Sequence, residues 1–334
     1  MITAELRRAI AAAAGADLAP LLRPATAPGS YASSLPFRLA APGQDPRQPA
    51  AALAARLETE PWIASAQVTG AGYLTVTITH DALAGLAVRI ARAGPACAAS
   101  DALRGRIVPA PPPADPLTEP TWPQARAALA AQVTARLAAA AGASFLFPAE
   151  RAPVPPPTPL PAVPVRPGPV ADAVRYAGPD AVRFALARIP PGRAWSAGAG
   201  LEAAVVARHI LANPAYAVRY AHAAAAAVLR WAAVLGTKPA GFRPGLLAEP
   251  GELALLDVLS WLPERVAVAA RRSRPDEFAG YLEELAARTI DTMNTTGFTT
   301  ISSISSERLW LADAARTGLA AGLGLLGVGA PARL

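Results

Sequence analysis

The sequence predicts an α+β protein with a small N-terminal α/β domain at residues 1–107, a proline-rich spacer at 108–170 and an all-α helix bundle at 171–334. Three observations predict this order. Polar and apolar residues alternate near residues 67–80, prolines crowd the middle of the chain, and apolar residues recur at three- and four-residue steps in the last half. With 334 residues, 53% of them hydrophobic, the chain is long enough for two or three domains.

The N-terminal part has helical patterns on both sides of a strand pair. Residues 1–20 predict an amphipathic helix rather than a secretory signal, and residues 46–59 predict a second helix. "QVTGAGYLTVTITH" at 67–80 alternates around a Gly-Ala-Gly turn, which predicts a hairpin or a bent strand pair. Residues 81–94 return to helical spacing and end on Gly94, a residue typical of helix C-caps.

The spacer is marked by two stretches, at residues 109–116 and 152–169, whose proline density excludes helix interiors and favours extended polyproline linkers. Between them, residues 122–142 predict one helix and "SFLF" at 144–147 predicts a short strand. A catalytic Rossmann domain needs several strand and helix pairs of roughly 30 residues each. This part has no room for them, so we predict a spacer with a small insert.

The last part is predicted to be helical nearly throughout, and its periodic apolar residues predict an antiparallel bundle. The predicted helices cover residues 178–189, 201–236, 251–272, 274–294 and 305–327.

The amino-acid composition indicates which class of partner the chain could bind and in which cellular compartment it is expected. A formal net charge of +7 favours a polyanionic partner such as nucleic acid, although a genome that favours arginine gives the same balance. Lys238 is the only lysine. Cys97 is the sole cysteine, which excludes an internal disulfide and a cysteine-based zinc site and predicts a cytoplasmic location. No run of about 18 uncharged apolar residues is present, so we predict no membrane span.

Motifs for catalysis are missing. The three histidines, His80, His209 and His222, form no HExxH pair, and the chain has no GxSxG elbow, Walker loop or complete GxGxxG. The glycine at Gly70 is explained better by a hairpin turn than by a phosphate cradle. We therefore predict no catalytic residue, no cofactor and no metal site.

"NPAYAVRYAHAA" at 213–224 places aromatic and basic residues in an alanine-rich helix. Tyr216 and Tyr220 are one turn apart on one face, with Arg219 beside them. Such a platform can stack a splayed base and hold a phosphate, as recognition of single-stranded RNA requires. Alternatively, both tyrosines pack the bundle with their hydroxyls at its rim.

Four stretches of the helical part share a family pattern in order and spacing. They are "GPDAVRFALAR" at 178–188, "NPAYAVRYAHAA" at 213–224, "PERVAVAARRSRPDEFAGYLEELAA" at 263–287 and "RLWLADAARTGLAAGLGLLGVGAPARL" at 308–334. The second is similar to the "NPvYYvQYAHAR" signature of class I arginyl-tRNA synthetases, where it opens the helical anticodon-binding domain of the DALR type. The resemblance implies that domain here.

The N-terminal part carries the same resemblance. "GSYASSLPFRLA" at 29–40 is similar to the family's "GDYqaN" motif, and "VTGAGYLTVTI" at 68–78 to its "v.vaGPGFiNi" motif, with Ala71 in place of proline. In the family this domain touches the outer corner of the tRNA near the D-loop. The resemblance implies a contact at Tyr31 and at Ser34, which stands where the family usually has asparagine.

The resemblance also shows what is absent. Family members activate arginine with ATP through "HIGH" and "KMSKS" motifs, which neutralise charge on the phosphates. Neither motif is present, and Lys238 lies in the helical part. Within the signature, Ala217 replaces a tyrosine, Arg219 a glutamine and Ala224 an arginine. The insert at 122–147 is either a remnant of the catalytic domain or a new docking element.

Our first hypothesis is a non-catalytic arginyl-tRNA synthetase paralogue that binds tRNA, of the arginine type or otherwise, or a tRNA-like RNA through both retained domains. The alternative is a protein-interaction or regulatory subunit that reuses the bundle and does not bind RNA. An intact ligase is the least favoured, because the residues for adenylate chemistry are absent. The predicted RNA-binding residues are Tyr216, Arg219, Tyr220, His222, Tyr31 and Ser34.

Overall fold

The contacts in the computed structural model divide the chain into two compact units. Unit 1 comprises Met1–Cys97, Ala224–Glu264 and Arg288–Gly318, and unit 2 comprises Ala98–Ala223, Arg265–Ala287 and Leu319–Leu334. Each unit joins segments far apart in the sequence. The predicted domain boundaries near residues 107 and 170 stay a prediction. The structure describes residues 1–15, 20–110, 115–146, 169–190, 206–300 and 304–334.

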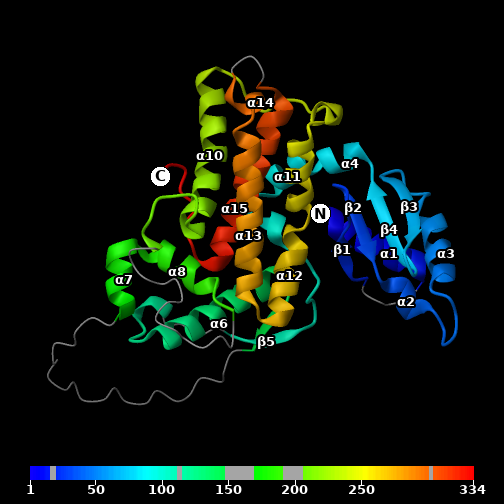
Figure 1. Cartoon of the computed structure of the whole chain (residues 1–334), viewed down its shortest axis with the longest axis horizontal. Helices are drawn as coiled ribbons and strands as arrows, with labels where there is room; N and C mark the ends of the chain where they lie inside the picture. Colours follow the sequence, from blue (N-terminus) through cyan, green and yellow to red (C-terminus); the bar gives the residue numbers. More distant parts are fainter. Residues whose placement is uncertain (16–19, 111–114, 147–168, 191–205, 301–303) are drawn as a thin grey trace. The chain divides into compact units, whose positions relative to one another are not determined.

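A four-stranded antiparallel sheet forms the N-terminal part of unit 1 (Figure 1). Its strands are β1 (Leu22–Pro24), β2 (Ser30–Ser33), β3 (Ile63–Thr69) and β4 (Tyr73–Ile78), in the order β1-β2-β4-β3. The predicted hairpin is confirmed as β3 and β4, whereas β1 and β2 are too short to stand out in the sequence. Gly72, at φ 125°, allows the hairpin turn to approach Pro46, because an added Cβ would lie 2.8 Å from the proline Cβ.

The two faces of this sheet differ. Leu74, Val76 and Ile78 are buried, while Tyr73, which has the opposite parity, is exposed. Tyr31 on β2 lies opposite Val76 and so shares the covered face. The predicted helices near residues 1–20 and 46–59 are confirmed as α1 (Ile2–Ala14) and α3 (Arg47–Leu57), and α3 contacts both β3 and β4.

Hydrogen bonds join this sheet to the helix α11 (Pro250–Ser260) within unit 1. The Gly29 amide donates to Asp257 Oδ1 at 2.8 Å, and the Tyr31 hydroxyl donates to Ser260 Oγ at 2.8 Å. The Tyr31 ring also lies 5.2 Å from the Trp261 ring. The sheet and α11 therefore form one packed core although more than 200 residues separate them.

Three shorter helices accompany the sheet in the chain: α4 and α5 follow its last strand, and α2 follows β2. The helix predicted at 81–94 is present as α4 (His80–Ala84) and α5 (Leu86–Ala93), which Gly85 divides. Thr79 caps α4 by accepting a hydrogen bond from the Ala82 amide at 3.3 Å. α2 (Leu35–Leu39) lies between β2 and α3.

Unit 2 contains a strand–helix–strand motif within the predicted spacer. β5 (Ile107–Pro109) and β6 (Ser144–Leu146) are parallel, and α6 (Trp122–Ala140) connects them, as a parallel pair requires. The predicted helix at 122–142 is thus confirmed, and so is the predicted strand over residues 144–146, while Phe147 lies outside the described residues. β5 is an addition. Of the predicted polyproline stretches, residues 111–114 and 152–168 lie outside the described residues.

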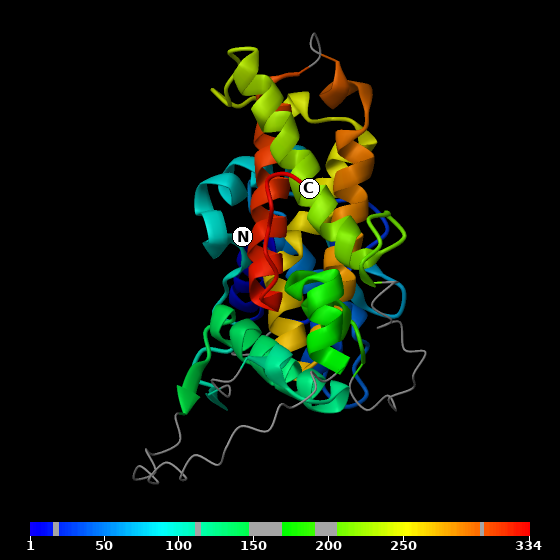
Figure 2. The ribbon, with the colours of Figure 1, turned by 90° about the vertical axis from the view of Figure 1, so that its left-hand side faces the viewer.

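The helices α7 (Pro169–Ala177) and α8 (Pro179–Ala187) pack with α6 in the same unit (Figure 2). The helical C-terminal part is confirmed, but two of its predicted helices are divided. Of the run at 201–236, residues 201–205 lie outside the described residues, Val206 is helical and α10 begins at Pro214. The run at 251–272 is divided at Trp261. The remaining helices are α12 (Leu262–Arg272), α13 (Pro275–Met293), α14 (Thr296–Thr299) and α15 (Ser306–Leu326).

α10 (Pro214–Val234) begins where it does because of its first residues. Proline suits the first helical position, and the Asn213 side chain accepts a hydrogen bond from the Ala215 amide at 3.2 Å. Asn213 also donates to the carbonyls of Val206 and Arg208, at 2.9 and 2.7 Å.

None of the helices in the described part of the chain has both the length and the apolar character of a membrane span.

Candidate nucleic-acid interface

Three stacked rings stand at the start of α10. The His209 ring lies 5.3 Å from the Tyr216 ring at an interplanar angle of 12°, and Tyr216 lies 5.8 Å from Tyr220 at 27°. His209 is exposed, and both tyrosines are half-buried. We call His209, Tyr216 and Tyr220 the α10 ring stack. The sequence predicted the two tyrosines but missed the stacking of His209, because it depends on how the hydrogen bonds of Asn213 to the Val206 and Arg208 carbonyls fold the preceding segment back.

Arg219 and His222 face inward from the same helix. Arg219 Nη2 lies 3.8 Å from Asp180 Oδ2 on α8, and its side chain is 25% exposed. Asp180 Oδ1 accepts a hydrogen bond from the Gly329 amide at 3.0 Å. Arg219 thus holds α10 to α8 and retains only a partly exposed guanidinium for a phosphate.

His222 corrects the sequence-based prediction. Its side chain is buried, at 4% exposure, and its Nδ1 lies 2.8 Å from the Pro331 carbonyl oxygen. A buried imidazole with a backbone partner packs the helix against the C-terminal segment and cannot meet an RNA at the surface. His222 is therefore a packing residue.

Tyr31 is corrected in the same way. Its side chain is wholly buried, with its hydroxyl on Ser260 and its ring against Trp261. Burial raises the pKa of the Tyr31 phenol far above its ordinary value. This tyrosine is part of the core. Ser34, half-buried at the start of α2, makes no capping hydrogen bond with its side chain and stays a candidate.

An exposed aromatic pair, of which Phe37 lies three residues from Ser34 in the chain, was missed in the sequence. Phe37 and Tyr73 are each 38% exposed, with ring centroids 4.9 Å apart at 60°. Arg38 follows Phe37, and Arg47 donates from Nη2 to the Gly70 carbonyl in the turn before Tyr73, at 3.3 Å. We call Phe37 and Tyr73 the N-terminal aromatic pair. Strand alternation places Tyr73 on the same face as Thr75, so the sequence could have predicted that Tyr73 is exposed. The contact between Tyr73 and Phe37 joins two separate elements and could not be predicted from the sequence.

Both surfaces can stack a flat ring and contact phosphate, since each combines partly exposed aromatic rings with a neighbouring arginine. Within the described ranges, no group of three or more His, Cys, Asp or Glu side chains is placed to hold a metal ion. The arrangement favours binding through stacking and charge.

Comparison with known proteins supports the sequence resemblance. Residues 1–78 match the family described as "Arginyl tRNA synthetase N terminal domain", and residues 218–334 match the "DALR anticodon binding domain". The chain therefore contains both domains of the predicted pair. Phe37 and Tyr73 lie in the first match, and Tyr220 lies in the second.

Relatives with these features include arginine–tRNA ligases. The ligase of Clavibacter sepedonicus is 39% identical over 168 residues, and that of Renibacterium salmoninarum is 37% identical over 168. Each alignment covers 49% of this chain and 30% of the relative, so the chain spans under a third of these proteins. The fold is similar to that of the Thermus thermophilus arginyl-tRNA synthetase, with a TM-score of 0.71, 16% identity and 100% coverage of each chain.

Proposed function

We propose that this chain binds tRNA, or an RNA shaped like it, on the N-terminal aromatic pair and the α10 ring stack. The observation that carries the proposal is that partly exposed, paired aromatic rings lie within the N-terminal match and at the start of the DALR match, which begins between Tyr216 and Tyr220. Stacking of one base on an aromatic ring contributes about 1–3 kcal/mol. The positive charge of the chain adds affinity for phosphates and depends on salt.

We also propose that binding occurs without aminoacylation by this chain. The two family matches leave residues 79–217 between them. Among its described residues, this range holds the short helices α4 and α5, one strand–helix–strand unit, α7, α8 and the first residues of α10. The KMSKS motif needs two lysines, and the sequence has only Lys238. Bound RNA would be held or presented, and any chemistry on it would belong to another protein.

The test is a filter-binding titration of total tRNA at two salt concentrations. Replacing both rings of the N-terminal pair (Phe37→Ala with Tyr73→Ala), or both tyrosines of the stack (Tyr216→Ala with Tyr220→Ala), should weaken binding about 10- to 100-fold. Tyr176→Ala is the matched control, because Tyr176 is 67% exposed on α7 and belongs to neither surface.

The binding measurements distinguish specific RNA contacts at the two surfaces from unspecific attraction. Binding that weakens with salt, falls in both double variants and survives in the control supports the proposal. No binding at low salt, or an equal loss in the Tyr176 control, contradicts it. Circular dichroism of each variant checks that the fold is unchanged.

The alternative partner is a protein, and one surface favours it. Trp231 is 64% exposed, Val234 81% and Leu235 41%. Val234 ends α10 and Leu235 follows it, about one turn after Trp231. Exposed apolar clusters of this kind mark protein contacts more often than RNA contacts. If tRNA does not bind, Trp231→Ser should abolish capture of the partner by the immobilised chain, while Tyr216→Ala should not.

A further inference from the structure

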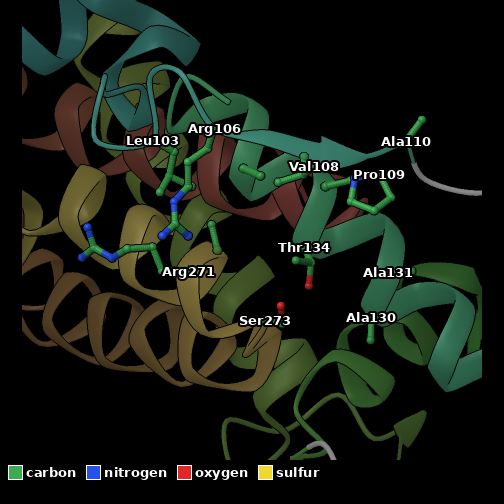
Figure 3. A pocket seen from close by; sticks show the side chains of 13 residues that line it. Leu103, Arg106, Val108, Pro109, Ala110, Ala130, Ala131, Thr134, Arg271 and Ser273 are labelled. Carbon is green, nitrogen blue, oxygen red and sulfur yellow. The ribbon is translucent and has the colours of Figure 1, made fainter. Parts of the chain in front are cut away.

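Unit 2 contains a cavity that the RNA proposal does not use. It has a volume of about 470 Å³ and lies between β5, the middle of α6 and the end of α12 (Figure 3). Small-molecule sites have volumes of roughly 300–1,000 Å³. One wall is a row of small side chains, Ala130, Thr134 and Ala138, each one turn from the next on α6. Larger residues at these positions would fill the space, as they do in close-packed interiors.

The polar groups around the cavity are cationic or neutral. Arg106 and Arg271 line it together with the hydroxyls of Thr134 and Ser273, and none of its described lining residues is acidic. In Figure 3 Arg106 and Arg271 lie toward one side, and Pro109, Ala130 and Ala131 lie toward the other. The cavity thus has a charged end and an apolar end.

Carboxylates close to this site in the chain are already paired. Glu277 lies 3.3 Å from Arg272, and Asp276 accepts a hydrogen bond from Arg274 at 2.8 Å. Arg106, by contrast, is exposed and has no acidic partner within the described ranges of the chain. An anion entering the cavity would therefore meet a guanidinium that the fold has not neutralised.

Ser273 gives an independent indication. Its φ is 52°, which makes it the one non-glycine residue with positive φ in the described part of the chain. It follows the last residue of α12, where a left-handed residue is usually glycine. A serine here costs stability relative to glycine, and its side chain lines the cavity. Strain retained at a cavity wall is typical of binding sites.

We propose that this cavity binds a small organic anion, with its apolar body against the α6 wall and its carboxylate or phosphate oxygens on Arg106 and Arg271. The guanidinium fork suits both kinds of oxygen. None of the lining residues belongs to the N-terminal aromatic pair or to the α10 ring stack. The proposal therefore stands whether or not the chain binds RNA.

The first experiment titrates anilinonaphthalene sulfonate, a fluorescent organic anion, into the full chain. Saturable binding at one site is expected, and Arg106→Glu should weaken it about tenfold or more. Arg104→Glu is the matched control, because Arg104 is 80% exposed, two residues away and outside the cavity. An equal loss in both variants means unspecific attraction and overturns the proposal, as does binding that does not saturate.

Competition identifies the anionic group. Displacement of the probe by adenosine monophosphate but not by decanoate indicates a phosphate ligand, and the reverse indicates a carboxylate ligand. Displacement by both supports an anion site of broad specificity. Displacement by neither overturns the proposal.

A second variant separates binding from folding. Ser273→Gly relieves the left-handed strain, so it should raise the denaturant midpoint of unfolding. The same change removes a hydroxyl from the cavity wall and should weaken probe binding about threefold. A variant that is more stable but binds the probe as tightly as the original chain would overturn the role given to Ser273 in the site.

Discussion

The two faces of the N-terminal sheet each carry a tyrosine, and the two side chains have opposite surroundings. Tyr31 on the covered face is wholly buried against Ser260 and Trp261, whereas Tyr73 on the other face is 38% exposed beside Phe37. The family motif indicated Tyr31 as an RNA-binding residue. Tyr73 became a candidate only because the structure shows that its ring is exposed. Residue type and motif position thus identify a domain, while the face of the sheet decides which side chain is available to a partner.

The largest effect that tests this comparison is on stability. Tyr31→Ala empties a fully buried site and should lower the free energy of unfolding by about 4 kcal/mol. Tyr73→Ala removes a partly exposed ring and should lower it by less than about 1 kcal/mol. Urea unfolding of both variants, followed by circular dichroism, measures the difference. Equal losses would show that the two faces are not buried differently.

A second change tests the packing of helix α1 within unit 1. Arg7 on α1 pairs with Glu264 in the first turn of α12, and the two side chains are 15% and 6% exposed. Glu264→Gln leaves a buried cation without its carboxylate and should cost about 3 kcal/mol. Asp101→Asn is the control, because the Arg104–Asp101 pair is 80% and 64% exposed and should contribute about 0.5 kcal/mol or less. Comparable losses in the two variants would contradict a packed α1.

The smallest expected change in the free energy of unfolding comes from removing the Tyr31 hydroxyl. Tyr31→Phe removes the hydrogen bond to Ser260 and should cost about 1 kcal/mol near neutral pH. Tyr73→Phe is the control and should change little, and neither variant should lose a ring on which RNA could stack.

The same variant has a pH signature. Burial raises the pKa of Tyr31 above its ordinary 10.0, so the folded state keeps the neutral phenol. Its stabilisation is complete below about pH 10 and is lost as the pH rises further, because the unfolded chain ionises first. Urea midpoints at about pH 8 and about pH 11 should fall less in Tyr31→Phe than in the original chain. Parallel falls would show that Tyr31 ionises as freely as an exposed tyrosine.

Local patterns were enough for most elements of this fold. The Gly-Ala-Gly turn with alternating flanks predicted β3 and β4, and apolar steps of three and four residues predicted the helices. The breaks were missed where one residue interrupts a continuous pattern, at Gly85 and at Trp261. β1, β2 and β5 have three or four residues each, too few for periodicity to show.

The candidate site was predicted only in part. The spacing of Tyr216 and Tyr220 follows from the helical period, so their stacking was within reach of the sequence. His209 joins them through a turn, and Phe37 meets Tyr73 from another element, so neither contact has a local pattern. Tyr31 and His222 are buried by Ser260 and Pro331, which lie 229 and 109 residues away.

The sequence by itself determined the two kinds of domain, the positive charge, the absence of the ligase motifs and the period of each main helix and strand. These properties depend on residue identity and on neighbours a few positions apart. The tertiary structure alone decided which aromatic side chains are exposed, that β5 pairs with β6, and that alanines on α6 line a cavity beside Arg106. Exposure and cavities depend on contacts between residues distant in the chain, and local periodicity does not report those contacts.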